Sequence, residues 1–150
     1  MPNAWRNSPS PATVREMSTL NWGILGCARV TRQVMGPGIR QSKNGRILAV
    51  ASRDVERARQ LADALRVERV HGSYEELLDD PDVQAVYIPL PNSLHREWTI
   101  KAAASGKHVL CEARMATNAQ EAREMLEASR KNFEEAEAQN PWFKSEFVDL

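Results

Sequence analysis

The sequence predicts an α/β fold, a doubly wound parallel sheet with the strand order 3-2-1-4-5. Short apolar runs alternate with stretches of helical periodicity along the middle of the chain, and this alternation is typical of strand–helix–strand units with right-handed crossovers. The run Arg46–Ser52 is almost continuously apolar, as expected of a parallel strand that helices cover on both faces. The 150 residues are enough for one such domain.

The first strand begins at Asn21 and leads into a helix expected over Arg29–Gln41. Gly36-Pro37-Gly38 interrupts that helix. An internal proline costs roughly 3 kcal/mol unless the helix kinks. We therefore expect a bend at this point.

The later helices are marked by their N-caps. Asp54 precedes a helix whose apolar residues recur at helical spacing up to Leu65. Ser73 and Glu76 form an S-x-x-E capping box for a third helix, and Asn118 precedes a fifth. The remaining expected elements are strands over 69–71, 85–88 and 108–112 and a helix over 94–104.

The two ends of the chain lack this pattern. Residues 1–18 carry three prolines among Asn, Ser and Arg, and we expect a mobile N-terminal extension there. The folded domain is expected over residues 19–130. Residues 131–150 are expected to form a divergent C-terminal tail, into which the fifth helix continues until Pro141 stops it.

A turn with a single glycine follows the first strand. Residues Gly26 to Thr31 read G-C-A-R-V-T, a version of the G-x-G-x-x-G/A fingerprint in which one of the three glycines is in place. Gly26 allows a tight turn, and Ala28 is small enough for a pyrophosphate to approach the backbone. The helix that starts near Arg29 directs its free N–H groups at that phosphate. The pattern indicates a dinucleotide-binding site; the alternative is a turn that binds nothing.

The predicted topology places further residues beside this turn. In a sheet of this order the switch point lies between strands 1 and 4, and ligands bind there at the carboxyl ends of the strands. The candidate cofactor-binding residues along this crevice are Gly26, Cys27, Ala28, Arg29, Val30, Ser52, Arg53, Pro89, Asn92, His95 and Glu112.

The end of the second strand indicates which cofactor is bound. Domains that bind NAD usually carry Asp or Glu there, bonded to the ribose 2′-hydroxyl. This chain has Ser52 and Arg53 instead, and a hydroxyl with a guanidinium suits a 2′-phosphate. The prediction is NADP, with NAD less favoured. The alternative is that Arg53 is an ordinary surface arginine near a helix start.

The loop after the fourth strand has two descriptions. Asn92 and His95 can direct polar groups toward the nicotinamide or its ribose. Alternatively, Asn92 or Ser93 caps the next helix and His95 is a solvated residue of its first turn. Taken without its context, His95 fits the second description better.

Composition excludes several other functions. The formal net charge is zero, so we expect no nucleic-acid or anionic-membrane partner. No apolar run has the length of a membrane span or the features of a signal peptide. Cys27 and Cys111 fall on strands that another strand separates, so we expect no disulfide and a reduced, cytoplasmic protein. The three histidines are scattered and no G-x-S-x-G elbow is present, so neither a metal site nor hydrolysis is expected.

Five longer motifs carry a resemblance: W-G-I-L-G-C-A-R-V at 22–30, A-V-A-S-R-D at 49–54, G-S-Y-E-E-L-L at 72–78, V-Y-I-P-L-P-N-S-L-H at 86–95 and G-K-H-V-L-C-E at 106–112. With them, residues 20–129 resemble the N-terminal domain of the glucose-fructose oxidoreductase / inositol dehydrogenase (Gfo/Idh/MocA) family, in particular its dihydrodiol and pentose dehydrogenase branch. The resemblance implies a Rossmann fold, a nicotinamide cofactor, and hydride exchange with a sugar-like or cyclic alcohol.

The sequence departs from the family at the end of the fifth strand. The family has Glu-Lys-Pro there, and its Lys assists proton transfer. This chain has Glu112-Ala113-Arg114. Ala113 has no titratable group and cannot act as acid or base, although Glu112 can still bond a ribose hydroxyl. The resemblance also implies a second domain with the substrate pocket, which these residues do not match. No catalytic residue is therefore expected in this chain.

Three functions remain open at this point. The chain is a cofactor-binding domain that is not catalytic alone, a pseudoenzyme or sensor whose NADP-bound state a partner recognises through Trp142 and Phe143, or an oligomerising scaffold without nucleotide. The crevice residues favour the first two. Self-association through the face that a second domain would cover is also expected.

Overall fold

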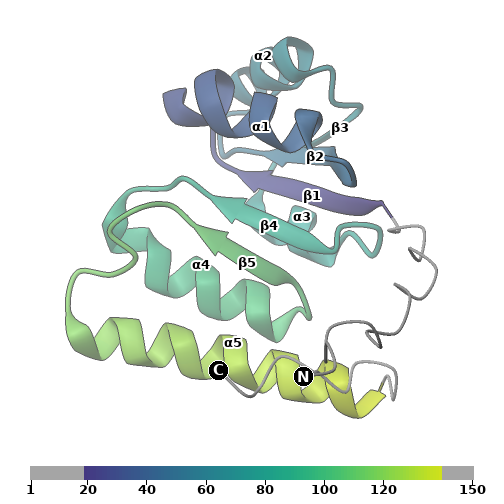
Figure 1. The fold of residues 1–150 in the computed structure, drawn as a ribbon. Helices are drawn as coiled ribbons and strands as arrows, with labels where there is room; N and C mark the ends of the chain where they lie inside the picture. Colours follow the sequence, from purple (N-terminus) through teal and green to yellow (C-terminus); the bar gives the residue numbers. More distant parts are fainter. Residues whose placement is uncertain (1–18, 140–150) are drawn as a thin grey trace, which may run out of the picture.

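The computed structural model describes residues 19–139. Five strands form one sheet in the predicted order β3-β2-β1-β4-β5 (Figure 1), and every neighbouring pair is parallel. The expected N-terminal extension and residues 140–150 lie outside the described residues. The strands are β1 (Leu20–Leu25), β2 (Gly45–Ala51), β3 (Arg69–His71), β4 (Ala85–Ile88) and β5 (His108–Cys111).

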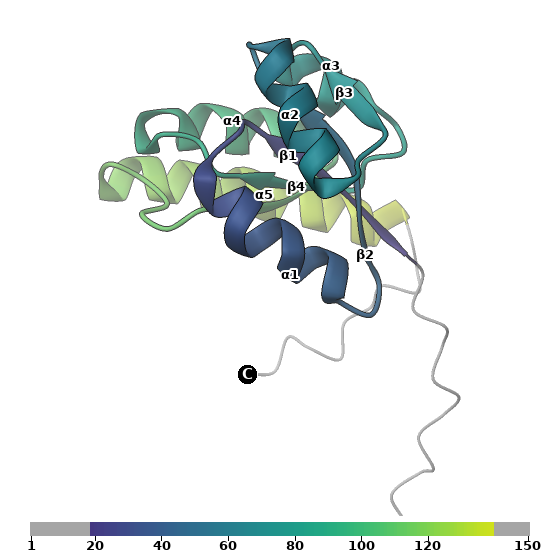
Figure 2. The ribbon, with the colours of Figure 1, turned by 90° about the horizontal axis from the view of Figure 1, so that it is seen from above.

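Helices cover both faces of this sheet, as its doubly wound topology requires (Figures 1 and 2). α1 (Gly36–Gln41) and α2 (Val55–Leu65) lie against one face. α3 (Tyr74–Asp79) and α4 (Asn92–Ala104) lie against the other, and α5 (Ala119–Gln139) packs on α4. α5 runs without a break through residue 130, where the tail was expected to begin.

The core is divided between the two faces by the alternation of the central strand. Ile24 packs into the cluster under α1 and α2, where it joins Leu61. Leu25 packs into the cluster under α3 and α4, with Leu77. Both strand residues are fully buried. The sheet is therefore apolar on both sides, which is why its strands are nearly continuous apolar runs rather than alternating ones.

The first helix was expected to bend at Gly36-Pro37-Gly38. In the structure, a wider helical turn lies just before these residues. The chain is helical from Arg29, and a π-helical segment, η2 (Thr31–Met35), precedes α1. The Gly36 N–H bonds the Thr31 carbonyl, one residue further back than in an α-helix. Pro37 has no N–H and its ring crowds the preceding turn, so a π turn accommodates it.

The predicted caps of three helices are confirmed. Asp54 Oδ1 accepts the N–H groups of Glu56 and Arg57 at 3.1 and 3.2 Å. Ser73 Oγ accepts the Glu76 N–H at 3.1 Å, but Glu76 Oε2 accepts the Gly72 N–H instead of the Ser73 N–H that a capping box requires. Asn118 Oδ1 accepts the Glu121 N–H at 2.9 Å. These caps fix where α2, α3 and α5 begin, and the start of α2 sets the geometry at the end of β2.

A buried lysine ties the start of β5 to the loop before β4. Lys107 Nζ donates to the carbonyls of Asp80 and Val83 at 2.7 and 2.8 Å. Burial lowers the pKa of its ammonium group, while the nearby carboxylates of Asp80, Asp79 and Asp82 oppose that shift. The Asp80 carbonyl also accepts the Val83 N–H at 3.3 Å, so Lys107 adds a second donor there and supplies the donor to the Val83 carbonyl.

Lys107→Met should lower the free energy of unfolding by about 2 kcal/mol, because it removes two buried hydrogen bonds and leaves the Val83 carbonyl without this donor. Urea unfolding followed by circular dichroism measures the effect. The matched control is Lys101→Met, which removes an exposed ammonium paired with Glu97 and Glu75 and should cost less than about 1 kcal/mol. Equal unfolding midpoints for Lys107→Met and the wild-type chain would contradict this role.

Candidate cofactor site

Gly26 forms the turn between β1 and the first helix. Its φ is +96°, a value that residues with a side chain rarely adopt. Its N–H donates to the Ala51 carbonyl at 2.8 Å. A Cβ at this position would lie 2.7 Å from Leu90 Cδ2. The turn thus needs glycine for its backbone angle, and the Leu90 side chain packs closely against it.

A hollow of about 450 Å³ opens beside this turn, at the carboxyl ends of the strands. A neighbouring hollow of about 310 Å³ shares Cys27, Ala28 and Arg57 with it and adds Arg29 and Arg32. The structure thus brings together residues that follow β1, β2 and β4, as the topology predicts. The larger hollow is lined by Gly26, Cys27, Ala28, Ser52, Arg53, Asp54, Arg57, Tyr74, Pro89, Leu90 and Pro91.

Two arginines border the β2 side of this hollow. Arg53 follows the strand and Arg57 lies one turn later on α2. Both residues are exposed, and among residues 19–139 neither guanidinium has an ion-pair partner. Ser52, which is 8% exposed, accepts the Asp54 N–H on its Oγ at 3.2 Å. Sequence reasoning missed Arg57, although its spacing of four residues from Arg53 was a usable signal.

Cys27 lies in both hollows without the properties of a nucleophile. Burial raises the pKa of its thiol, and the hydrogen bond with Ser52 and the positive charge of Arg57 offset this only in part. The thiol is therefore protonated near neutral pH, whereas a reactive cysteine needs a lowered pKa. Cys27 contributes shape and a weak hydrogen bond to the turn.

Glu112 follows β5 and is held from two directions. The Tyr87 hydroxyl donates to Oε2, and the Ala113 N–H donates to Oε1 at 2.8 Å. These bonds lower the pKa of the carboxyl group. Burial and the Glu112 carboxylate raise the pKa of Tyr87. Glu112 is thus an ionised acceptor in a fixed position, and Tyr87, which the sequence did not single out, orients it.

The residues after β4 differ from the second sequence-based description, in which His95 is solvated and Asn92 or Ser93 caps the helix. His95 is fully buried, so its description as a solvated residue is wrong. Its Nε2 lies 2.6 Å from the Leu90 carbonyl oxygen and its Nδ1 lies 3.1 Å from the Arg114 carbonyl oxygen. The N-cap of α4 is Pro91, without a side-chain cap. Asn92, partly buried in the first turn, therefore does not cap the helix.

The backbone of the loop after β5 is unusual at Arg114, next to Ala113, the two positions where the sequence differs from the family's Glu-Lys-Pro. Arg114 has φ +56°, in the left-handed region where a non-glycine residue is strained. Ala113 is exposed beside it. The left-handed turn is what brings the Arg114 carbonyl to His95.

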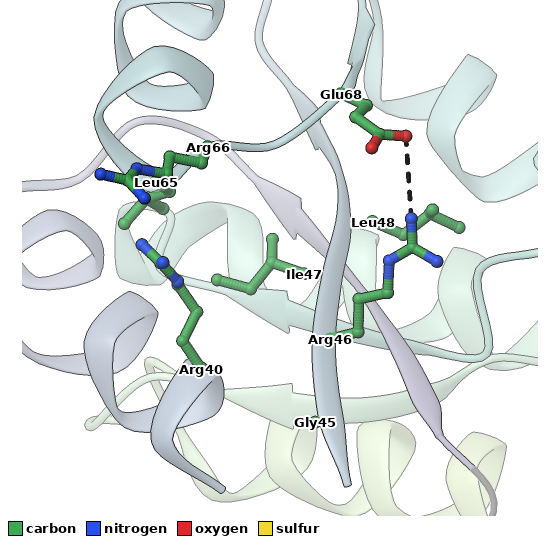
Figure 3. Close-up of a pocket in the computed structure, with 8 residues that line it drawn as sticks. All are labelled: Arg40, Gly45, Arg46, Ile47, Leu48, Leu65, Arg66 and Glu68. Atoms are coloured by element: carbon green, nitrogen blue, oxygen red, sulfur yellow. Dashed lines mark ion pairs between the residues drawn. The ribbon is translucent and has the colours of Figure 1, made fainter.

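A separate hollow of about 250 Å³ lies at the opposite, amino end of β2 (Figure 3). Arg40 in the last turn of α1 and Arg66 at the C-cap of α2 border it. Arg46 pairs with Glu68 at 3.7 Å on its other side. Positive side chains commonly compensate the negative C-terminal ends of helices. This hollow shares no lining residue with the one beside Gly26 and stands apart from the switch point.

Two kinds of feature are absent from the described part of the chain. Its His, Cys, Asp and Glu side chains form no group of three or more that could hold a metal ion. None of its helices combines the length and apolar character needed to cross a bilayer.

Comparison with known proteins identifies the family. Residues 20–135 match the model of the Gfo/Idh/MocA oxidoreductase family, described as an NAD-binding Rossmann fold. The chain belongs to this family. Its fold, the hollow at the switch point and the match agree that it carries an NAD(P)-binding Rossmann domain.

Other members show how much of the family architecture the chain spans. It is 45% identical over 100 residues to D-xylose 1-dehydrogenase (NADP(+)) 2 of Haloferax volcanii, covering 67% of this chain and 30% of the relative. It is 34% identical over 111 residues to trans-1,2-dihydrobenzene-1,2-diol dehydrogenase of Xenopus laevis, covering 73% and 34%. A 3-ketoreductase of Actinomadura kijaniata, solved in complex with NADP, has a TM-score of 0.73 at 34% identity, covering 77% and 36%. The chain spans about a third of the length of these relatives.

Proposed function

We propose that this chain is the NADP(H)-binding domain of a Gfo/Idh/MocA-type oxidoreductase. The dinucleotide's diphosphate lies against Gly26–Val30, where the first N–H groups of the helix have no partner within that helix. The 2′-phosphate lies at the end of β2. The nicotinamide half extends over the ends of β4 and β5, toward Pro89, Asn92 and Glu112.

The observation that carries the choice of NADP is the pair of arginines at the end of β2. Arg53 and Arg57 border the same hollow, and within residues 19–139 neither has an ion-pair partner. A guanidinium offers a planar fork of donors to phosphate oxygens. The Ser52 hydroxyl, whose oxygen already accepts an N–H, can turn its proton from Cys27 to a third phosphate oxygen. The 3-ketoreductase of similar fold was solved with NADP, which supports the same choice.

Asp54 is the feature that favours NAD instead. Its carboxylate also borders the hollow, and a carboxylate near this strand end can accept the ribose 2′-hydroxyl. However, Oδ1 is committed to two N–H groups at the start of α2. The two positive charges of Arg53 and Arg57 therefore favour a 2′-phosphate more than the Asp54 carboxylate favours a 2′-hydroxyl.

Calorimetric titration of the chain with NADPH and with NADH tests the choice. We expect NADPH to bind at least tenfold more tightly, and Arg53→Ala to remove most of that preference, which corresponds to about 1.4 kcal/mol. Asp54→Asn keeps the cap but removes the negative charge, so it should leave NADH binding unchanged and strengthen NADPH binding. Equal affinities in the wild-type chain, or a loss of NADH affinity in Asp54→Asn, would favour the NAD assignment.

Hydride exchange with a sugar-like or cyclic alcohol is proposed for the whole oxidoreductase. The 150 residues are proposed to bind the cofactor without catalysing turnover, since Ala113 cannot move a proton. The lack of a titratable side chain at Ala113 also favours a second candidate function. In it, the chain is a sensor whose NADP-bound form is recognised by a protein partner. Turnover of an alcohol by the 150-residue chain would exclude both proposals of a non-catalytic domain.

The two cysteines, which are not joined in a disulfide, are the basis for a proposal about the cellular location of the protein. Cys27 and Cys111 are both free thiols in the structure, separated by β4 as the topology predicts. Free thiols of this kind are typical of reducing compartments, and we propose a cytoplasmic protein.

A further inference from the structure

We propose that the amino-end hollow of Figure 3 is a second binding site, which takes a small anion of the phosphate class. It lies at the amino end of β2, whereas the dinucleotide is proposed to lie at the carboxyl ends of the strands. The two hollows share no lining residue. The proposal therefore goes beyond the proposed function and does not depend on it.

Two guanidinium groups converge on this hollow from different helices. Arg40 comes from the last turn of α1 and Arg66 from the residue after α2. In Figure 3 their side chains point toward one another, on the side of β2 where Ile47 lies. Both arginines are exposed, and within residues 19–139 neither guanidinium makes a hydrogen bond or an ion pair. Their donors are therefore available to a ligand.

The balance of charge in the hollow favours an anion. Arg46 also borders it, but its charge is neutralised by Glu68 at 3.7 Å. The C-terminal end of a helix carries about half a negative charge, so the ends of α1 and α2 together balance about one of the two positive charges of Arg40 and Arg66. About one positive charge is left for a ligand to neutralise. Phosphate oxygens suit it, because each guanidinium offers them a planar fork of donors.

The backbone at Arg66 is a second observation that points to a role for its side chain. Its φ is +53°, in the left-handed region where glycine is the usual residue after a helix. The Arg66 N–H bonds the carbonyls of Ala62 and Asp63 and so closes α2, but a glycine N–H would do the same. Arginine is therefore strained here without improving the helix end. What it adds is a guanidinium at the hollow.

The size of the hollow limits the ligand. Its volume is about 250 Å³, below the range of about 300–1,000 Å³ that is common for pockets enclosing drug-sized ligands. Ile47 and Leu65, which line it, are both buried, so the polar contacts come from the arginines at its border. An ion of the size of phosphate or pyrophosphate suits these limits, whereas a dinucleotide exceeds them.

Titration of the full chain with inorganic pyrophosphate, followed by NMR of the arginine side chains, tests the site. Sodium chloride keeps the ionic strength constant, so that general screening does not change during the titration. The largest Nε–H shifts should fall on Arg40 and Arg66 and should saturate. Arg66→Gly keeps the left-handed backbone and removes the guanidinium, so pyrophosphate should bind roughly tenfold more weakly. Arg40→Gln should weaken binding to a similar extent.

The matched control is Arg59→Gln, which removes the same charge from α2 at a residue that pairs with Glu56 and does not line the hollow. It should bind pyrophosphate within about twofold of the wild-type chain. Equal weakening by this control, or small shifts on all exposed arginines without saturation, would show general ionic attraction and overturn the proposal.

The two binding sites can be told apart in the same spectra. Pyrophosphate shifts confined to the amides of Gly26–Val30 would overturn the amino-end site and leave the proposed function standing. Saturating shifts on Arg40 and Arg66 in a chain that binds no NADPH would support the amino-end site and overturn the proposed function.

Discussion

Gly26→Val is expected to abolish detectable NADPH binding and to lower the free energy of unfolding by roughly 4 kcal/mol. The residue has φ +96°, which a β-branched side chain adopts only with strain. Its new Cβ would lie 2.7 Å from Leu90 Cδ2, so the Leu90 side chain must move. The added methyl groups would also occupy the space where the diphosphate approaches the backbone.

Chemical denaturation and calorimetric titration with NADPH measure the two effects. Gly38→Ala is the matched control, because nothing lies within 4 Å of a Cβ at that position and alanine favours the helix that contains it. It should bind NADPH as the wild-type chain does and be slightly more stable. NADPH affinity in Gly26→Val within threefold of the wild-type value would be incompatible with the proposed placement of the diphosphate.

Arg114→Pro is expected to cost roughly 3 to 4 kcal/mol of stability. The proline ring fixes φ near −65°, but the backbone at this position has φ +56°. The loop after β5 must therefore rearrange, and the bond between His95 and the Arg114 carbonyl is lost. The family's own triplet is thus incompatible with the loop that this chain forms.

The comparison with Arg114→Gly isolates the backbone effect. Glycine tolerates the left-handed angle, so this variant should be as stable as the wild-type chain or up to about 1 kcal/mol more stable. For the same reason, Ala113→Lys combined with Arg114→Pro should fail to give dehydrogenase activity and should unfold at lower denaturant concentration. An Arg114→Pro variant as stable as Arg114→Gly would show that the loop geometry is different.

The sheet could be predicted from the sequence because each of its signals is local and repeated. The buried strands are nearly continuous apolar runs, and Asp54, Ser73 and Asn118 mark helix starts by a mechanism that involves only neighbouring residues. The strand order followed from the dinucleotide-binding fold that the Gly26 turn and the family resemblance indicate, since right-handed crossovers alone allow other orders. The form of the irregularity before Pro37 did not follow, because a π turn and a kink both relieve the same steric conflict.

The site was predictable only where strand ends determine it. Gly26, Ser52 and Pro89 meet at one hollow because parallel strands end at one edge of the sheet. The burial of His95 was not predictable, since it depends on two carbonyls from separate loops. One of these carbonyls belongs to Arg114, whose left-handed backbone the sequence does not indicate, because arginine rarely adopts it.

The central claim is that a dinucleotide's diphosphate lies against the turn after β1, and amide NMR during an NADPH titration tests it most directly. We predict that the largest shifts fall on Gly26–Val30, with a second group on Ser52 and Arg53 that weakens when NADH replaces NADPH. Shifts confined to the amino-end hollow of Figure 3, around Arg40 and Arg66, or no shifts at millimolar NADPH, would contradict the claim.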